Sequence, residues 1–396
     1  MTSSETRPNA LYFILRERSS LSAPPQPGIS PARPAVSAAD RVRNFWQRVS
    51  EGRQIDDLWS QFAADARSSY GFYGRDVDWD EIHKLPRWRQ PLHVAREFFW
   101  ALLLKMTPAR RVLLLLAFVL LVMSGFENVK FEFAAAILFL LLLSLELADK
   151  VTMKRDLEIA REIQSWLVPS QAPPVEGAEI AFATRPQNSV AGDYYDVFYP
   201  KPEERERLMM VIADVAGKSV PAALLMATLQ ASLRTIAGED APLAELVARL
   251  NRYACGHSLE GRRFTTAVLG EFNPILRRLA YVNAGHNAPI LRRASGAVES
   301  LEVGGLPLGI RSDVNYETAS LELKPGDALI FFTDGVVEAF NEAGEEFGNE
   351  RWLSAIRNLP DWDAQQTLQF LMKRVDEFVG ATRQSDDITC MVFRSR

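Results

Sequence analysis

Two long apolar runs in the first half of the chain constrain its fold more than any other feature. The residues of Val112–Met123 are all apolar, as are those of Phe133–Leu143, and a short polar stretch separates the two runs. Extended to Ala109–Phe126 and Phe131–Ala148, each run has about 18 residues, close to the ~20 that cross a bilayer as a helix. Neither run has a polar face, which argues against a helical hairpin buried in a soluble core. We therefore expect a transmembrane helical hairpin at residues 109–148.

Basic residues flank this hairpin at both ends. Arg110 and Arg111 lie at its start, and Lys150, Lys154 and Arg155 follow its end. Because Lys and Arg concentrate in the cytoplasmic segments of membrane proteins, we expect both ends of the hairpin in the cytoplasm. The chain has only two cysteines, which is typical of a reducing compartment.

The rest of the chain divides around the hairpin. We expect residues 1–40 to be a disordered tail, because prolines among small polar residues cannot build a core. Residues 41–108 are expected to form an aromatic-rich helical region, 149–168 a linker helix and 169–396 a separate domain. The linker has an apolar stripe that suits either packing on its own domain or a short parallel dimer seam. This stripe consists of Met153, Leu157, Ala160, Ile163 and Leu167, and Pro169 ends it.

The residues after the linker predict a different architecture. Six short segments rich in Val, Ile, Phe and Thr predict strands, and four segments have helical spacing. The strands come in runs, not in strict alternation with helices, which favours an α+β domain of antiparallel sheets with packed helices. The expected strands are Ala178–Thr184, Leu208–Val215, Phe264–Phe272, Arg278–Asn283, Ala328–Thr333 and Ile388–Phe393, and the expected helices are Pro221–Thr235, Leu243–Cys255, Glu350–Asn358 and Ala364–Phe378.

Composition excludes several classes of function. The net charge of −5 and the pI near 5.6 provide no basic field that would recruit nucleic acid. With 4 histidines and 2 cysteines in the whole chain, a zinc site built from Cys and His is not expected. Any metal would therefore be held by oxygen ligands.

Acidic residues recur where the expected strands begin or end. Asp193 follows a glycine, Asp214 ends a buried strand, Asp334 follows a second buried strand, and Asp386 precedes the last strand. One such Asp is usually only part of a turn, but four in one domain favour a cluster. Like charges ~4 Å apart cost about 4 kcal/mol per pair at an effective dielectric of ~20, so converging carboxylates need bound cations. Carboxylates without His or Cys select Mg²⁺ or Mn²⁺, and such a cluster suits a two-metal site for phosphoryl chemistry.

From about Arg161 to Phe393, the motifs resemble those of the SpoIIE/RsbU branch of the PPM metal-dependent serine/threonine phosphatases. Each motif is short, but together they follow the family's order across more than half of the chain. The motifs are Glu162–Pro169, Gly192–Asp196, Asp214–Lys218 with Pro221–Leu224, Phe264–Ala267, Asn283–Pro289, Gly305–Gly309, Phe332–Ala339 and Asp386–Thr389. The resemblance implies an α-β-β-α sandwich, two Mn²⁺ or Mg²⁺ ions, and hydrolysis of phosphoserine or phosphothreonine without a phosphoenzyme.

The resemblance also implies a role for each acidic residue. Asp214 would bridge both metals, and the carbonyl oxygen of Val215 would complete the coordination of one of them. Asp193, Asp334 and Asp386 would supply the remaining direct ligands. These four aspartates are therefore the expected catalytic and metal-binding side chains.

Other residues of the motifs have two interpretations. Asp196 and Asp387 are expected to be structural and not direct ligands. His286 could act as a general acid, but the resemblance favours a structural turn. Lys218 is either a contact to phosphate or a solvated loop residue.

The chain departs from the family pattern at two glycine positions. Ala191 and Ser219 stand where the family has glycine, which predicts altered loop geometry rather than lost metal binding. No arginine closely precedes Asp193, since the nearest is Arg185. Substrate positioning would then depend on the metals and on the backbone.

These inferences predict a phosphatase anchored in the inner membrane of a bacterial cell, with its catalytic domain in the cytoplasm. The resemblance suggests that the substrate is a phosphorylated anti-anti-sigma factor of the STAS type, in partner-switching control of transcription. Two alternatives stay open. The domain could be an inactive scaffold that docks partners, against which the four retained aspartates argue, or an enzyme for small phosphoesters.

Overall fold

The computed structural model describes residues 82, 86, 89–124, 129–217, 220–257 and 263–396. The expected disordered tail and most of the expected N-terminal region lie outside the described residues, as do Lys218 and Ser219. The chain forms two compact units, residues 1–139 and 140–396.

The described part of the first unit is helical. Its elements are α4 (Gln90–Lys105), α5 (Pro108–Ser124) and the start of α6 (Val129–Leu167). The ring of Phe118 on α5 packs edge-on against Phe99 of α4 and Phe139 of α6, with centroid separations of 5.6 Å and 5.8 Å. Two helices therefore occupy the segment where the hairpin was expected.

Apolar side chains cover the outer surface of these helices. Val112, Val122, Phe133 and Ile137 are each at least 65% exposed, which a soluble surface seldom tolerates in one continuous area. By length and composition, two described helices could cross a membrane, α6 and α7 (Val220–Ala237). α7 buries its apolar face inside the second unit, whereas only 11% of the apolar window of α6 is buried.

The linker expected at 149–168 is not separated from the hairpin, because α6 continues without a break to Leu167. The residues of the expected apolar stripe differ in burial. Leu157 and Ala160 are half-buried, whereas Met153 and Ile163 are exposed. At ~100° per residue, Met153 lies between Leu157 and Ala160 around the helix, so position along α6, and not the helix face, separates Met153 from them.

The second unit contains two mainly antiparallel sheets. The first, sheet A, has the order β1-β11-β10-β6-β7, and the second, sheet B, has the order β2-β3-β4-β5-β8 with β9 also paired to β5. Among the strands that the structure describes, the short β5–β8 pair is parallel and the other pairs are antiparallel. Sheet A consists of β1 (Ala178–Arg185), β6 (Ile290–Arg292), β7 (Val298–Ser300), β10 (Ala328–Phe332) and β11 (Ile388–Ser395), and sheet B of β2 (Tyr194–Phe198), β3 (Leu208–Val215), β4 (Thr265–Asn273), β5 (Arg278–Ala284), β8 (Gly304–Gly305) and β9 (Ala319–Glu322).

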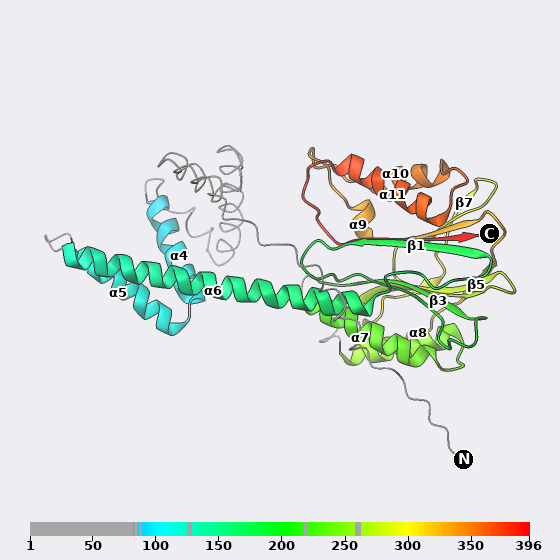
Figure 1. Ribbon diagram of the computed structural model, residues 1–396, viewed down its shortest axis with the longest axis horizontal. Helices are drawn as coiled ribbons and strands as arrows, with labels where there is room; N and C mark the ends of the chain where they lie inside the picture. The colour runs from blue at the N-terminus through cyan, green and yellow to red at the C-terminus, as the bar shows by residue number, and fades with distance from the viewer. Residues whose placement is uncertain (1–81, 83–85, 87–88, 125–128, 218–219, 258–262) are drawn as a thin grey trace, which may run out of the picture. The chain divides into compact units, whose positions relative to one another are not determined.

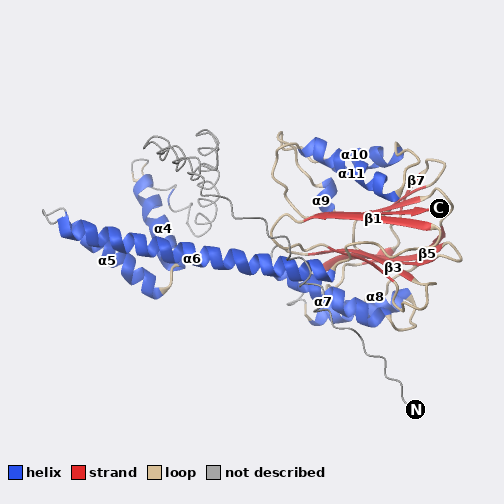
Figure 2. Cartoon of the chain, in the orientation of Figure 1, coloured by secondary structure: helices blue, strands red, loops and turns tan. Residues whose placement is uncertain are grey.

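Helices cover the outer face of each sheet, so that the domain has four layers (Figures 1 and 2). α7 and α8 (Leu243–Gly256) pack on sheet B, while α10 (Gly348–Arg357) and α11 (Ala364–Val379) pack on sheet A, next to the short α9 (Asp334–Val337). Between the sheets, the buried rings of Phe272 and Phe393 meet at 4.7 Å, because each faces inward from its strand. This architecture confirms the expected α-β-β-α sandwich.

Candidate metal centre

The strand registers bring the four expected aspartates to one edge of the sandwich. β2 and β3 are antiparallel with Tyr194 opposite Ala213, so Asp193 lies one step further on, opposite Asp214. In sheet A, Phe332 of β10 is opposite Cys390 of β11. The residues that follow β10 therefore lie beside those that precede β11, and Asp334 and Asp386 are among these.

Asp193 is buried, with 4% of its surface exposed, and it receives hydrogen bonds from the opposite sheet. Its Oδ2 accepts from the hydroxyls of Thr333 at 3.0 Å and Thr389 at 2.5 Å. Burial raises the pKa of Asp193 well above its ordinary value, and the Asp214 carboxylate raises it further, whereas the Thr389 hydroxyl lowers it. Two neighbouring carboxylates in a buried place are stable in the ionised form beside a cation.

Glycine at position 192 lets the Asp193 loop approach the end of β3. A Cβ atom at Gly192 would lie 3.3 Å from the carbonyl oxygen of Val215 and 3.7 Å from Oδ1 of Asp214. The carbonyl and the carboxylate that the family pattern assigns to metal binding therefore face the same glycine. A larger residue would fill the space beside both oxygens.

A second glycine brings the loops of sheet A together. A Cβ atom at Gly335 would lie 2.0 Å from the carbonyl oxygen of Asp387, a distance that excludes any side chain. The first turn of α9, which begins with Asp334, is therefore in direct backbone contact with the segment of Asp386. Asp214, Asp334 and Asp386 are all partly exposed, as residues that receive a substrate must be.

The donor set consists of oxygen atoms only. Four carboxylates and one backbone carbonyl are hard ligands that fit Mg²⁺ or Mn²⁺. Among the described residues, no three acidic, histidine or cysteine side chains are close enough to enclose a metal ion in these conformers. The structure thus brings Asp193 to Asp214, and Asp334 to the segment of Asp386, without closing all four around one point.

Asp196 and Asp387 have protein partners for their carboxylates, in agreement with their expected structural role. Asp196 is fully buried and accepts from Nε and Nη2 of Arg234, each at 2.8 Å, while the Tyr194 hydroxyl donates to it at 2.7 Å. Asp387 accepts the backbone N–H groups of Gln187 and Gly192, each at 2.6 Å. Asp387 thereby holds the Asp193 loop against β11.

His286 is a buried bridge between the two sheets, and its geometry argues against general acid catalysis. Its Nε2 lies 3.1 Å from the carbonyl of Phe332 in β10, and its Nδ1 lies 2.8 Å from the hydroxyl of Thr266 in β4. Nε2 must carry the proton, because a carbonyl only accepts, and Thr266 then donates to Nδ1. Burial lowers the pKa of His286 to about 4, so that the ring is neutral.

Arg185, the arginine nearest before Asp193, is not available as a phosphate clamp in this structure. Its guanidinium forms a two-point ion pair with Asp376 on α11, with one N–O distance of 2.9 Å. Lys218, the other cation considered for phosphate, is outside the described residues. Neither interpretation of Lys218 is tested.

Gln164, near the end of α6, is a contact of the site that sequence reasoning missed. Its side-chain amide donates to the carbonyl of Ala191 at 2.7 Å and accepts from the N–H of Ala191 at 2.9 Å. A cavity of about 320 Å³ adjoins this contact, and Asp193 and Met226 are among its lining residues. The only sequence signal was that Gln164 belongs to one of the family motifs.

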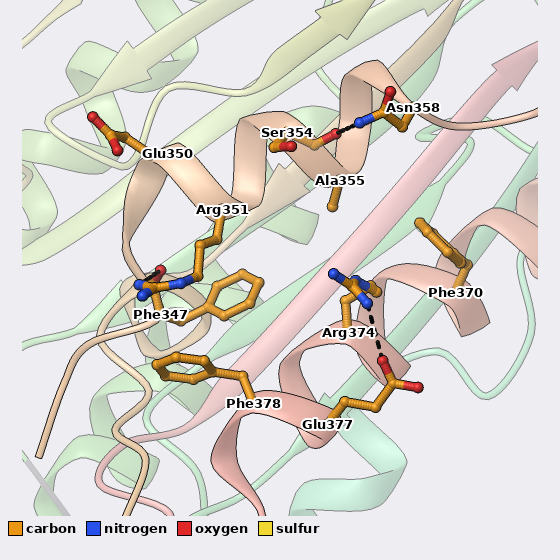
Figure 3. A pocket seen from close by; sticks show the side chains of 10 residues that line it. All are labelled: Phe347, Glu350, Arg351, Ser354, Ala355, Asn358, Phe370, Arg374, Glu377 and Phe378. Carbon is orange, nitrogen blue, oxygen red and sulfur yellow. Dashed lines mark hydrogen bonds and ion pairs between the residues drawn. The ribbon is translucent and has the colours of Figure 1, made fainter. Parts of the chain in front are cut away.

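A larger hollow lies elsewhere, between α10 and α11, with a volume of about 510 Å³ (Figure 3). Aromatic rings line it, and the Arg351 guanidinium stacks 4.8 Å from the ring centre of Phe378. Arg374 pairs with Glu377 across its edge at 3.2 Å. None of the expected catalytic residues lines this groove, so it is not the candidate centre.

Comparison with known proteins agrees with this geometry. Residues 204–396 match the family described as "Stage II sporulation protein E (SpoIIE)". Phosphoserine phosphatase RsbU of Bacillus subtilis is 28% identical over 193 residues, which are 48% of this chain and 56% of that protein. Protein IcfG of Synechocystis is 26% identical over 282 residues, 64% of this chain and 44% of that protein. The chain thus spans about half the length of these relatives.

The solved SiaA-PP2C domain of Pseudomonas aeruginosa has the same fold. It aligns with a TM-score of 0.54 at 22% sequence identity, covering 63% of this chain and 99% of that domain. The family match includes Asp214, Asp334 and Asp386, while Asp193 precedes the matched residues. Residues 204–396 of this chain therefore belong to the SpoIIE family of PPM-type phosphatase domains.

Proposed function

We propose that this protein is a metal-dependent phosphatase that removes phosphate from phosphoserine or phosphothreonine of a regulatory protein. The observation that carries the proposal is the approach of Asp193, Asp214 and the Val215 carbonyl at Gly192, next to residues 204–396 that match the SpoIIE family. A non-enzymatic scaffold would have no reason to bury one carboxylate beside another.

The residues that would hold Mn²⁺ or Mg²⁺ are Asp193, Asp214, Asp334 and Asp386, with the carbonyl of Val215. Bound there, the ions would supply activation of water and neutralisation of phosphate charge. The protein itself contributes fixed geometry: Asp387 holds the Asp193 loop, and glycine at 192 and 335 allows the loops to touch. Neutral His286 joins the sheets behind the site and keeps its proton on Nε2.

The substrate we propose is a phosphorylated anti-anti-sigma factor of the STAS type. Support comes from the resemblance of the motifs and from the relative named phosphoserine phosphatase RsbU. The partly exposed position of Asp214, Asp334 and Asp386 at a sheet edge suits a phosphorylated side chain on a protein surface. Substrate capture with Asp334→Asn, followed by identification of the phosphosite, would name the partner.

We also propose that α5 and α6 anchor the protein in the inner membrane, with the catalytic domain in the cytoplasm. Their exposed apolar side chains and the flanking Arg and Lys residues support this placement. Beyond the membrane, Ile159, Ile163 and Trp166 form an exposed apolar row at steps of four and three on α6. This row, and not the whole expected stripe, would be the seam of a homodimer.

The deciding experiment uses the purified full chain in detergent. We expect Mn²⁺-dependent hydrolysis of 4-nitrophenyl phosphate that EDTA removes, and faster turnover of a phosphorylated STAS protein than of nucleotides. Absence of any Mn²⁺-dependent hydrolysis would support the scaffold alternative. Preferential turnover of nucleotides would support a small-phosphoester enzyme.

A further inference from the structure

Two threonines on the side of sheet A contact the same oxygen of Asp193, which directly precedes β2 of sheet B. Thr333 lies at the end of β10, and Thr389 lies in β11 directly opposite, with the N–H of Thr333 donating to the Thr389 carbonyl at 3.0 Å. Both hydroxyls donate to Oδ2 of Asp193. No donor among the described residues reaches Oδ1 of Asp193.

The direction of each hydrogen bond in this network is fixed. An ionised carboxylate only accepts, so the hydroxyls of Thr333 and Thr389 must both donate to it. The hydroxyl of Thr389 then accepts from Thr184 of β1, whose Oγ1 lies 2.9 Å away. The hydroxyl of Thr333 accepts from the backbone N–H of Thr389 at 3.0 Å. Every hydroxyl in the network is therefore oriented when Asp193 is ionised.

Thr333 contacts Asp193 in place of a more usual partner. It is the N-cap residue of α9, and a threonine at that position normally accepts a hydrogen bond from an N–H in the first turn of the helix. Its side chain makes no such bond here. The hydroxyl instead donates to Asp193 on the other side of the sandwich. A role in helix formation alone would not require this contact.

We propose that Thr333 and Thr389, the threonine clamp, are positioning residues for the metal centre. By holding Oδ2, they fix the rotamer of Asp193 and leave Oδ1 as the oxygen offered to a divalent cation. They also join the two sheets at the edge where the carboxylates of sheet B must meet those of sheet A. This inference rests on the proposed function, because it concerns the same centre.

The test measures Mn²⁺ binding to the purified full chain from the electron paramagnetic resonance signal of free Mn²⁺. Thr389→Val and Thr333→Val keep the shape of the side chain and remove the hydroxyl. Each is expected to weaken Mn²⁺ binding at least tenfold. Thr389→Ser and Thr333→Ser, which keep the hydroxyl, should stay within threefold of the wild type.

Thr184→Val is the matched control, because its hydroxyl contacts Thr389 but not Asp193. Its Mn²⁺ affinity should also stay within threefold of the wild type. The unfolding temperature in EDTA shows which variants are folded, and Thr333→Val decides the question if Thr389→Val is not folded. Wild-type affinity in a folded valine variant would refute the clamp alone. Absence of Mn²⁺ binding in the wild type would refute the proposed function as well.

Discussion

Replacing Gln164 with leucine should loosen the loop that carries Asp193 and weaken the whole domain. The substitution removes both hydrogen bonds between the α6 side chain and the backbone of Ala191, at 2.7 Å and 2.9 Å. Ala191 is buried, so its N–H and C=O lose their partners in a place that solvent reaches poorly. An unsatisfied buried polar group costs about 1–3 kcal/mol.

For the N–H and the C=O of Ala191, the expected cost lies at the lower end of this range, about 1 kcal/mol each. The adjoining cavity of about 320 Å³ can admit water, which occupies ~30 Å³ per molecule in the liquid and would replace part of the lost bonding. The expected loss is therefore about 2 kcal/mol for the two groups together. In a domain of this size, that lowers the unfolding temperature by roughly 4–8 °C. If about half of this free energy is lost from the positioning of the Asp193 loop, the Mn²⁺ concentration for half-maximal activity rises roughly fivefold.

The assay combines thermal unfolding in EDTA with Mn²⁺ titration of 4-nitrophenyl phosphate hydrolysis. Gln164→Glu should give an intermediate result, because the carboxylate still accepts from the N–H of Ala191 but cannot donate to its carbonyl. Ser165→Ala is the control, since that exposed hydroxyl bonds only to the Glu162 carbonyl within the same helix. If Gln164→Leu behaves like Ser165→Ala in both measurements, the contact does not position the loop.

Three further predictions concern the centre, the interior and the membrane segment. Asp214→Asn should lower Mn²⁺-dependent turnover by far more than tenfold, and retention of a tenth of the activity, ~1.4 kcal/mol of barrier, would exclude Asp214 as a metal ligand. The free energy of unfolding should fall as the pH drops from ~6.5 to 4. Over this range His286 binds a proton in the unfolded state but stays neutral in the folded protein, where burial lowers its pKa to about 4. His286→Gln should flatten this slope in urea unfolding, and an unchanged slope would contradict the assignment. Asn128→Cys should react with an impermeant reagent in intact cells, and reaction only after lysis would refute the hairpin topology.

Much of the sandwich could be predicted because its longer strands are sharply bounded and strongly apolar. Leu208–Val215 was predicted with its observed ends, and Ile388–Phe393 fell two residues short of the end of β11. β2 was missed, since all five of its residues are buried and the polar Asp196 among them hides the strand pattern. Asp196 is tolerated there because Arg234 neutralises it, and a partner 38 positions away leaves no local signal.

The centre was predictable as a set of residues but not as a set of contacts. The position of Asp after each strand identifies the loops, and antiparallel pairing alone explains why Asp193 meets Asp214. Contacts across the sandwich, such as Thr389 with Asp193, depend on how two sheets stack, and no periodicity within one segment encodes that.

The strand order has a consequence for how the protein is made. All strands of sheet B lie within residues 194–322, so the ribosome delivers them as one continuous segment. The central strand pairs of sheet A cannot form until β11 is synthesised, because β11 pairs with both β1 and β10. β11 emerges some 70 residues after the end of β9. At ~5–20 residues per second, that is a delay of about 4–14 s. Asp193 and Asp214 can therefore meet on the nascent chain while Asp386 has yet to be synthesised, and the unpaired edge of β1 must stay protected during that interval.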